Sequence, residues 1–272
     1  MSAESDRYTH GHHESVLRSH TWRTADNSAA YLLPHLRPAM RLLDVGCGPA
    51  TITIDFARIL SSGSVVGLEP IEQPLETARK NAADAGVGNI EFVIGDVYGL
   101  EYADDSFDVV HAHQVLQHLT DPVAAIKEMA RVCKPDGYLA FRDADYAAMS
   151  WFPQVARLDE WQELYQTVTR SNRAEPNAGR HLKKWSQDAG LVDMTLTASV
   201  WSYATAEEVA WWSSLWADRT ISSNFGVQAV ADGHVTAEEA ADISAGWREW
   251  GEDPAAVFFI PNAEVLARPS KA

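Results

Sequence analysis

The stretch LLDVGCGPA, from Leu42 to Ala50, decides the fold of this chain. An apolar run over Arg41–Val45 stops at glycine, and the residues from Thr51 to Leu60 have apolar side chains at helical spacing. Glycines let the backbone turn sharply and approach a ligand closely. The helix N-terminus adds free N–H groups and the positive end of a dipole. The stretch therefore predicts a strand, a ligand-binding loop and a helix.

Strand and helix patterns continue to alternate as far as residue 143. Strands are predicted at 64–68, 90–94, 107–112 and 138–142, and helices at 71–85 and from 121 to about 133. This order requires parallel strands joined by helical crossovers on both faces, and the strands read as continuous apolar runs, as buried parallel strands do. The prediction is a doubly wound α/β sheet that binds its ligand beyond the carboxyl ends of the strands.

The remaining residues predict a helical cap on this core. Helices are expected at 28–36, 151–170, 181–189 and within 204–250, and strands at 191–200 and 263–268. We assign residues 1–40 to an N-terminal lid, 41–200 to a Rossmann-like core with a helical segment at 145–180, 201–255 to a cap and 256–272 to the last strand. Cap segments carry eight of the ten tryptophans. Three interpretations of these tryptophans are open: they line an apolar acceptor pocket, they pack the helices against the sheet, or they form an oligomer interface.

Composition excludes several classes of function. The net charge is −16, whereas nucleic-acid binders need a basic footprint, so we expect neither a nucleic-acid nor a membrane partner. No run approaches the roughly 18 apolar residues of a membrane helix, and the N-terminus lacks a signal-peptide layout. We therefore expect a cytoplasmic monomer or homodimer with reduced Cys47 and Cys133. The segment from Tyr8 to His13 lacks a second ligand cluster, so we predict no metal site.

The acidic residues at the strand ends indicate which class of ligand the glycine loop binds. A dinucleotide loop would read GxGxxG, and the third glycine position holds Thr51. Asp44 precedes the loop, where a carboxylate would repel a pyrophosphate and could face an ammonium group. Glu69 ends the second strand and can accept both ribose hydroxyls. Asp96 ends the third strand and can accept a hydrogen bond from an adenine amine. These acids favour a cationic amino-acid ligand attached to a nucleoside.

The sequence at these positions resembles the class I S-adenosylmethionine-dependent methyltransferases, especially the branch of ubiquinone and menaquinone biosynthesis. The resemblance rests on LLDVGCGPA, the acid in VVGLEP, GDV, DDSFDVVHAHQVLQHL and RVCKPDGYLAFRD, over about residues 40–143. It implies a seven-stranded sheet with an antiparallel last strand, S-adenosylmethionine as cofactor and S-adenosylhomocysteine as product. Ala50 departs from the family, in which glycine is usual, and its methyl group could crowd the methionine part of the ligand.

We therefore predict a set of cofactor-binding residues at the strand ends, with Ile71 and Val97 enclosing the adenine ring and Arg23 pairing with the carboxylate. The set comprises Arg23, Asp44, Gly46, Cys47, Gly48, Glu69, Pro70, Ile71, Gln73, Gly95, Asp96, Val97, His113 and Gln114.

Methyl transfer from a sulfonium is an in-line displacement, in which alignment supplies most of the catalysis and a base helps with acidic acceptors. The candidate catalytic residues are His113 and His118 near the end of the fourth strand and Asp143 after the fifth. The alternative role for the two histidines is to pack around the cofactor. The alternative for Asp143 is that it is a solvated carboxylate in a loop. The acceptor is expected to be a small molecule that reacts at oxygen, nitrogen or carbon.

Two other functions remain open at this point. An NAD(P)-dependent oxidoreductase is weakened because no tyrosine has a lysine four residues later. A protein that binds S-adenosylmethionine and catalyses a different reaction keeps every cofactor residue. A pure interaction module explains none of the acids at the strand ends.

Overall fold

The computed structural model describes residues 22–269. Its strands are β1 (Arg41–Val45), β2 (Ser64–Glu69), β3 (Ile90–Ile94), β4 (Phe107–His113), β5 (Cys133–Ala144), β6 (Ser150–Phe152), β7 (Met194–Tyr203) and β8 (Val257–Ala267). Its helices are α2 (Ala25–Ser28), α3 (Thr51–Ile59), α4 (Glu72–Asp84), α5 (Pro122–Val132), α6 (Ala156–Ser171), α7 (Ala178–Asp188), α8 (Ala206–Ser222), α9 (Asn224–Ala231) and α10 (Ala237–Glu252). Three short 3₁₀ turns are η1 (Leu33–His35), η2 (Leu116–His118) and η3 (Tyr146–Ala148). Most of the predicted lid, with Tyr8 and His12, lies outside the described residues.

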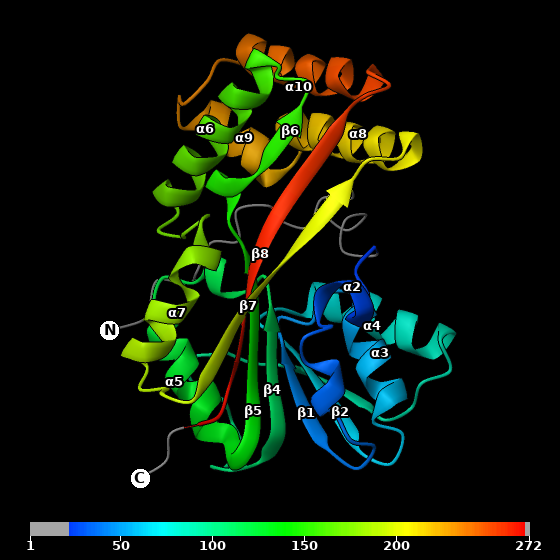
Figure 1. Cartoon of the computed structure of the whole chain (residues 1–272), viewed down its shortest axis with the longest axis vertical. Coiled ribbons are helices and arrows are strands. Elements are labelled where there is room, and N and C mark those ends of the chain that lie inside the picture. Colours follow the sequence, from blue (N-terminus) through cyan, green and yellow to red (C-terminus); the bar gives the residue numbers. More distant parts are fainter. Residues whose placement is uncertain (1–21, 270–272) are drawn as a thin grey trace.

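One mixed sheet forms the centre of the molecule (Figure 1). The strands β3, β2, β1, β4 and β5 lie side by side in that order and are parallel, whereas β8 runs antiparallel to β5. One edge of β8 pairs with β5 and then with β6, and its other edge pairs with β7. The mostly parallel, doubly wound sheet is confirmed. It has eight strands within the described chain rather than seven, because the short β6 extends the line of β5.

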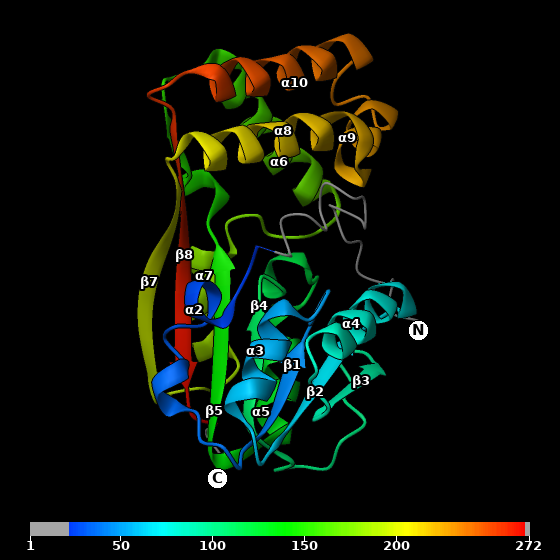
Figure 2. The same cartoon turned by 90° about the vertical axis from the view of Figure 1, so that its right-hand side faces the viewer.

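Helices cover both faces of the parallel strands. On one face Leu32 and Phe56, from the N-terminal segment and α3, pack against Val109 of β4. On the other face Met129 of α5 and Leu182 of α7 belong to a second apolar cluster. The two views agree that α3 and α4 lie opposite α5 and α7 (Figures 1 and 2). Because the strands are parallel, every crossover helix between them begins at the edge of the sheet where their carboxyl ends lie.

A second layer of helices lies beyond the carboxyl ends of the parallel strands (Figure 2). Here α6, α8, α9 and α10 enclose an aromatic core of their own, in which Trp161, Trp216, Trp247 and Trp250 are fully buried around Phe258 of β8. These tryptophans pack the cap instead of lining a pocket. The helix expected from residue 151 begins only at Ala156, since three residues of strand are too short to show a period.

The strands β7 and β8 connect the sheet to the cap. They form an unbroken antiparallel ladder from Met194 opposite Ala267 to Tyr203 opposite Phe258. The strand β8 is longer than the predicted 263–268, and β7 has the predicted length but lies three residues further along the chain than 191–200. Their residues alternate between two faces and so escape a search for apolar runs. The ladder places the inner end of the cap directly above the cofactor side of the sheet.

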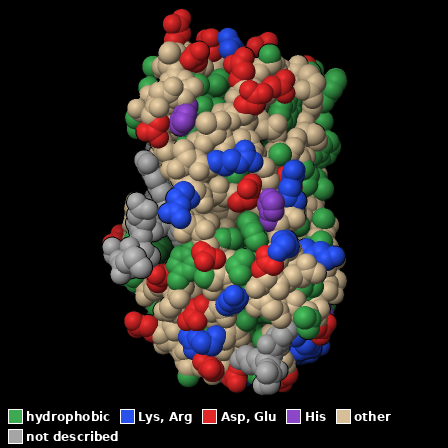
Figure 3. All heavy atoms as spheres, turned by 90° about the vertical axis from the view of Figure 1, so that its left-hand side faces the viewer, with side chains coloured by type: hydrophobic (Ala, Val, Ile, Leu, Met, Phe, Trp, Pro, Cys, Tyr) green, Lys and Arg blue, Asp and Glu red, His purple; other side chains and the backbone are tan. Residues whose placement is uncertain are grey.

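Charged side chains of both signs lie on the face of the molecule that Figure 3 shows. On the face shown in Figure 3, lysine and arginine side chains are scattered among acidic ones and form no continuous basic patch. Across residues 22–269 every helix is too short or too polar to traverse a bilayer.

Candidate cofactor and acceptor site

The glycine loop between β1 and α3 has the backbone geometry that its sequence predicts. Gly46 has a φ of +68° and Gly48 a φ of +54°, both in the left-handed region. A Cβ at Gly46 would lie 2.5 Å from Cγ2 of Val115. The Gly46 N–H donates to the carbonyl of Leu68 at 2.8 Å. The loop is therefore held against the end of β2 at a position that only glycine can occupy without displacing its neighbour.

Ala50 explains why glycine is usual in this position. It has a φ of +65° and precedes the first turn of α3, a conformation that L side chains rarely adopt. Its methyl group belongs to a buried cluster with Ile54, Ala78 and Ala82. Ala50 is absent from the lining of the pocket beside the loop. In the structure, the departure from the family therefore strains the backbone without placing a methyl group in that pocket.

Asp44 at the end of β1 is fixed from two sides. Its Oδ2 accepts a 2.6 Å hydrogen bond from the hydroxyl of Thr53, and its Oδ1 lies 2.7 Å from Nδ1 of His111. The side chain is buried but contributes to the pocket lining. An ionised carboxylate can accept about four hydrogen bonds, so these two contacts leave capacity for an ammonium group. His111 is fully buried.

Glu69 ends β2 beside the loop. Its Oε1 accepts a 2.6 Å hydrogen bond from the Gly48 N–H. Burial raises the pKa of Glu69 to about 7, the Gly48 hydrogen bond opposes the rise, and the negative charge of Asp44 adds to it. Desolvated carboxylates without full hydrogen bonding have this property. A ligand whose hydroxyl groups donate hydrogen bonds to Glu69 would stabilise the ionised form of this carboxyl.

The other predicted residues at the ends of β2 and β3 differ in exposure. Pro70, Ile71, Gln73 and Asp96 are exposed, Gly95 is partly exposed, and Val97 is buried. The Gly95 N–H donates to the Glu69 carbonyl at 2.9 Å, which holds the two strand ends together. Asp96 Oδ1 accepts from the Tyr98 N–H at 2.9 Å. Enclosure of an adenine ring between Ile71 and Val97 stays a prediction.

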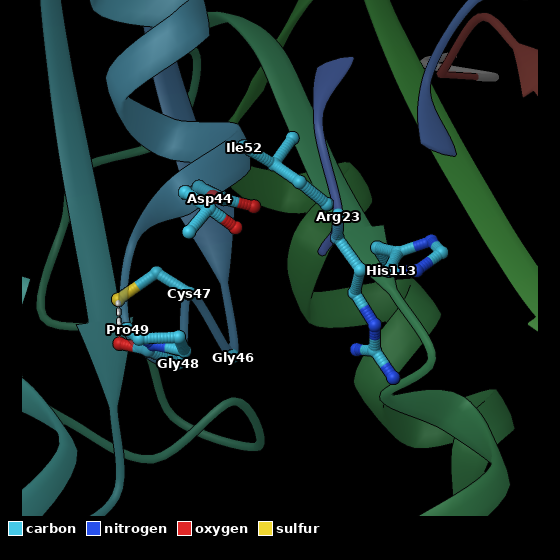
Figure 4. A pocket seen from close by; sticks show the side chains of 9 residues that line it. Arg23, Asp44, Gly46, Cys47, Gly48, Pro49, Ile52 and His113 are labelled. Carbon is cyan, nitrogen blue, oxygen red and sulfur yellow. Dashed lines mark hydrogen bonds between the residues drawn. The ribbon is translucent and has the colours of Figure 1, made fainter. Parts of the chain in front are cut away.

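A pocket lies between the loop and the N-terminal segment. It is lined by Arg23, Asp44, Gly46, Cys47, Gly48, Pro49, Thr51, Ile52 and His113. Figure 4 shows Arg23 and His113 on the opposite side of the pocket from Asp44, Cys47 and Gly48. The sequence-based prediction missed Pro49, Thr51 and Ile52, although the start of the helix after a ligand-binding loop is the place to seek them.

Cys47 is a small residue of the loop and not a reactive thiol. Burial raises the pKa of its thiol well above the usual value, and the nearby carboxylates of Glu69 and Asp44 raise it further. The thiol is thus kept protonated, whereas nucleophilic cysteines have a lowered pKa. Within residues 22–269, no group of three or more His, Cys, Asp or Glu side chains is arranged to hold a metal ion.

Aromatic side chains extend from the pocket towards the cap. The ring of His113 lies 5.5 Å from that of Trp201 on β7, and Trp22 lies 5.3 Å from Trp201 and 5.4 Å from Tyr203. Trp211 of α8 lies 6.2 Å from Trp22. We call Trp22, Trp201, Tyr203 and Trp211 the aromatic wall. The rings pack at angles to one another next to the cofactor pocket, with Trp201 and Tyr203 buried and Trp22 and Trp211 partly exposed.

His118 and Asp143 occupy the opposite face of β4 and β5 from Arg142. The Gln117 N–H donates to Asp143 Oδ1 at 3.1 Å, and Gln117 Nε2 lies 3.1 Å from His118 Nε2. Burial raises the pKa of Asp143 to about 8. Burial, together with the positive charge of Arg23, lowers the pKa of His118 to about 3. At neutral pH, Asp143 is therefore a protonated carboxyl and His118 a neutral imidazole.

The pocket offers groups that fit S-adenosylmethionine. This ligand carries a ribose diol, an ammonium, a carboxylate and a sulfonium. Asp44 and Arg23 line the pocket and can face an ammonium and a carboxylate group. The buried Glu69 lies behind the lining residue Gly48, to which it is bonded, and can accept hydrogen bonds from hydroxyls. Gly46 and Gly48 line the pocket without adding side-chain atoms to it.

Comparisons with known proteins show the family of the chain. Residues 36–193 match the family described as "Methyltransferase domain". The chain is 33% identical over 279 residues to an uncharacterized methyltransferase of Schizosaccharomyces pombe, and the alignment covers 98% of each chain. It is 40% identical over 102 residues to a ubiquinone biosynthesis O-methyltransferase of Neisseria meningitidis, covering 37% of this chain and 42% of the other.

The fold also resembles a geranyl diphosphate methyltransferase solved in complex with S-adenosylmethionine. The TM-score is 0.53 at 14% identity, and the match covers 89% of this chain and 84% of the other. At this identity the likeness concerns the fold alone.

Proposed function

This chain belongs to the family of methyltransferase domains, and from that membership we propose that it methylates a small apolar or aromatic molecule held between the cofactor pocket and the helical cap. The protein is an S-adenosylmethionine-dependent methyltransferase. The observation that carries the proposal about the acceptor is the aromatic wall, in which Trp201 contacts His113 of the pocket and Trp211 belongs to the cap.

The bound cofactor supplies a methyl group on a sulfonium, and its leaving group is a neutral thioether. In the proposal, Glu69 accepts the ribose hydroxyls, the loop at Gly46 and Gly48 contacts the amino-acid part, and Arg23 pairs with the carboxylate. The N-terminus of α3 adds N–H groups at this position. These residues fix the direction of the methyl group, and alignment is the main contribution that the protein must make.

The aromatic wall supports an acceptor with a flat or apolar surface. Trp201 and Tyr203 are almost completely buried, and Trp22 packs on both. Such rings bind aromatic molecules by stacking or edge contact. They also exclude water from the reacting centre, which suppresses hydrolysis of the reactive donor.

Of the three predicted catalytic residues, His113 is the best candidate to contact the acceptor, because it lines the pocket and meets Trp201. His118 is a poor general base at neutral pH, because its pKa of about 3 makes it a weak proton acceptor. Asp143 holds the turn η2 through the Gln117 N–H and so positions the residues after β4.

We further propose an electron-rich ring, such as a phenol or hydroquinone, as the acceptor class. The support is the partial similarity to the ubiquinone biosynthesis enzyme together with the wall. That similarity is confined to about a third of the chain, so the ring class and not the compound is proposed.

The test uses S-adenosylmethionine labelled on the methyl group, with a panel of phenols, hydroquinones, aliphatic amines and carboxylic acids. We expect the label to appear on members of the phenol or hydroquinone class. We also expect a labelled product when an extract of the native host supplies the acceptor. Label on amines or carboxylic acids alone would overturn the acceptor class. Conversion of a substrate with the labelled cofactor recovered intact would instead support a reaction other than methyl transfer. Calorimetric titration with S-adenosylhomocysteine and with NAD tests the remaining alternative. Binding of NAD without binding of S-adenosylhomocysteine would indicate an oxidoreductase.

A further inference from the structure

Gln114 has an unusual backbone conformation at the end of β4. It directly follows His113, and its φ of +53° lies in the left-handed region that favours glycine. Its N–H donates to the carbonyl of Arg142 at 2.7 Å, which continues the pairing with β5 for one more residue. Residues held in such conformations cluster at functional sites. Its side-chain contacts suggest why glutamine occupies this position.

Both ends of the Gln114 side chain are engaged by distant segments. Its Oε1 accepts a 2.6 Å hydrogen bond from Nη2 of Arg23, which precedes α2. Its Nε2 donates to Oδ1 of Asn262 on β8 at 3.3 Å. Asn262 is buried, and its own Nδ2 donates to the Ile260 carbonyl at 2.9 Å. One amide therefore connects the N-terminal segment, the end of β4 and the strand that leads to the cap.

Arg23 is the part of this connection that reaches the cofactor pocket. It lines the pocket with Asp44 and the glycine loop, whereas Gln114 does not. Figure 4 shows the guanidinium across the pocket from Gly46 and Gly48. A long arginine side chain that is already held in place loses less freedom when a ligand binds. The hydrogen bond from Nη2 to Gln114 supplies that restraint.

We infer that Gln114 is a positioning residue that fixes the guanidinium of Arg23 in the wall of the cofactor pocket. It contributes to cofactor affinity through Arg23 and makes no independent contact with the ligand. This inference rests on the proposed function, in which Arg23 pairs with the cofactor's carboxylate. It also revises the sequence-based prediction, which placed Gln114 among the direct cofactor ligands.

A double-mutant cycle on the full chain tests the inference, with affinity for S-adenosylhomocysteine measured by calorimetry. The variants are Arg23→Ala, Gln114→Gly and their combination, and glycine at 114 leaves the left-handed backbone free of strain. We expect each single variant to bind about tenfold more weakly. The double variant should bind no more weakly than Arg23→Ala. Multiplied effects, near a hundredfold, would show an independent contact and overturn the inference, as would unchanged affinity in either single variant.

Two further variants separate positioning from a purely structural role. Gln114→Glu keeps an oxygen for Arg23, loses the donor to Asn262 and adds a negative charge that holds the guanidinium more firmly, so we expect its affinity to stay within about threefold of the wild type. Loss as large as in Gln114→Gly would contradict this. Asp105 has a φ of +61° in the loop before β4, at the other end of that strand. Asp105→Gly is the matched backbone control, with unchanged affinity expected.

The same titrations distinguish failure of this inference from failure of the proposed function. If the wild-type chain binds no S-adenosylhomocysteine, the proposed function fails and the inference fails with it. If the wild type binds and the effects of Arg23→Ala and Gln114→Gly multiply, only the positioning role of Gln114 is wrong.

Discussion

The Gly48 N–H and the Glu69 carboxylate form a 2.6 Å hydrogen bond that ties the glycine loop to the end of β2. Gly48 lies in the loop after β1 and Glu69 ends the neighbouring parallel strand β2, and the register of the two strands places Val45 opposite Leu68. A ligand in contact with the loop therefore also meets Glu69. Binding energy and loop geometry at this position depend on one carboxylate.

Replacing Glu69 tests this dependence. Glu69→Ala should weaken S-adenosylmethionine binding by roughly 1–3 kcal/mol, because two charge-assisted hydrogen bonds to the ribose are lost. Equilibrium titration of the folded variant is the measurement. Glu72→Ala, at an exposed position on α4 paired with Arg79, is the matched control and should bind normally. An unchanged dissociation constant in Glu69→Ala would show that another residue holds the ribose.

Cofactor affinity should rise with pH near neutrality. Burial raises the pKa of Glu69 to about 7, so the carboxyl of the free protein is mostly protonated at pH 6 and mostly ionised at pH 8. Hydroxyl donors favour the ionised form, so binding releases a proton and strengthens as pH rises through this range. Calorimetry in buffers of different ionisation enthalpy measures that proton.

The variant Glu69→Gln provides the control for this pH dependence. The amino group of the ligand also titrates near this range, and it does so equally with either protein. The difference between the wild type and Glu69→Gln therefore isolates the carboxyl. Identical pH profiles for the two proteins would contradict the assignment.

Gly46→Ala should destabilise the fold by about 2 kcal/mol or more. The left-handed backbone costs an L residue roughly 1–2 kcal/mol, and the new Cβ would lie 2.5 Å from a Val115 methyl group, which adds overpacking. Urea unfolding measures the change. A variant as stable as the wild type would mean that the loop rearranges without difficulty.

Ala50→Gly is expected to change the free energy of unfolding by less than about 1 kcal/mol. Relief of the left-handed backbone gains roughly 1–2 kcal/mol. Loss of one buried methyl group costs about 0.8 kcal/mol, and the greater freedom of glycine in the unfolded chain costs about 0.5–1 kcal/mol. These terms nearly cancel. A large gain on urea unfolding would show that strain at Ala50 dominates.

Asp143 should make the protein less stable as pH rises from about 4 to about 8. Burial raises the pKa of its carboxyl from 3.8 to about 8, so within this window the folded chain binds a proton that the unfolded chain has released, and stability falls with rising pH. Asp143→Asn removes the titration and should be more stable than the wild type at pH 9, by on the order of 2 kcal/mol. Parallel pH profiles in urea unfolding would refute the role of burial.

The parallel half of the fold could be predicted from sequence because its strands are buried on both faces. Val65 and Val66 are both buried, and so are Val109 and Val110, so each strand reads as an apolar run that ends at a turn. The acids Asp44 and Glu69 mark the ends of two such runs. Their position at the cofactor edge follows directly from parallel topology.

The antiparallel half was harder to predict for a physical reason. On β7, Thr197 and Ser199 face the buried pair of Arg142 and Glu264 and bond to Glu264, so polar residues occupy an inward face. The tryptophan spacing on α8 also could not distinguish a pocket from a core, because Trp212 and Trp216 suit either. The contact between Gln114 and Arg23 joins residues 91 positions apart, a separation that no local pattern encodes.

The unbroken ladder between β7 and β8 limits how the protein can move. A cap joined through two hydrogen-bonded strands has no loop at that junction about which it could swing, unlike enzymes that close by bending at a hinge. We therefore expect the cap and the sheet to tumble as one body, and exchange of acceptor and product to depend on smaller displacements. The segment that carries Trp22 and Arg23 contacts the sheet through Gln114 and Trp201. It is the part of the described chain best suited to open a path to solvent.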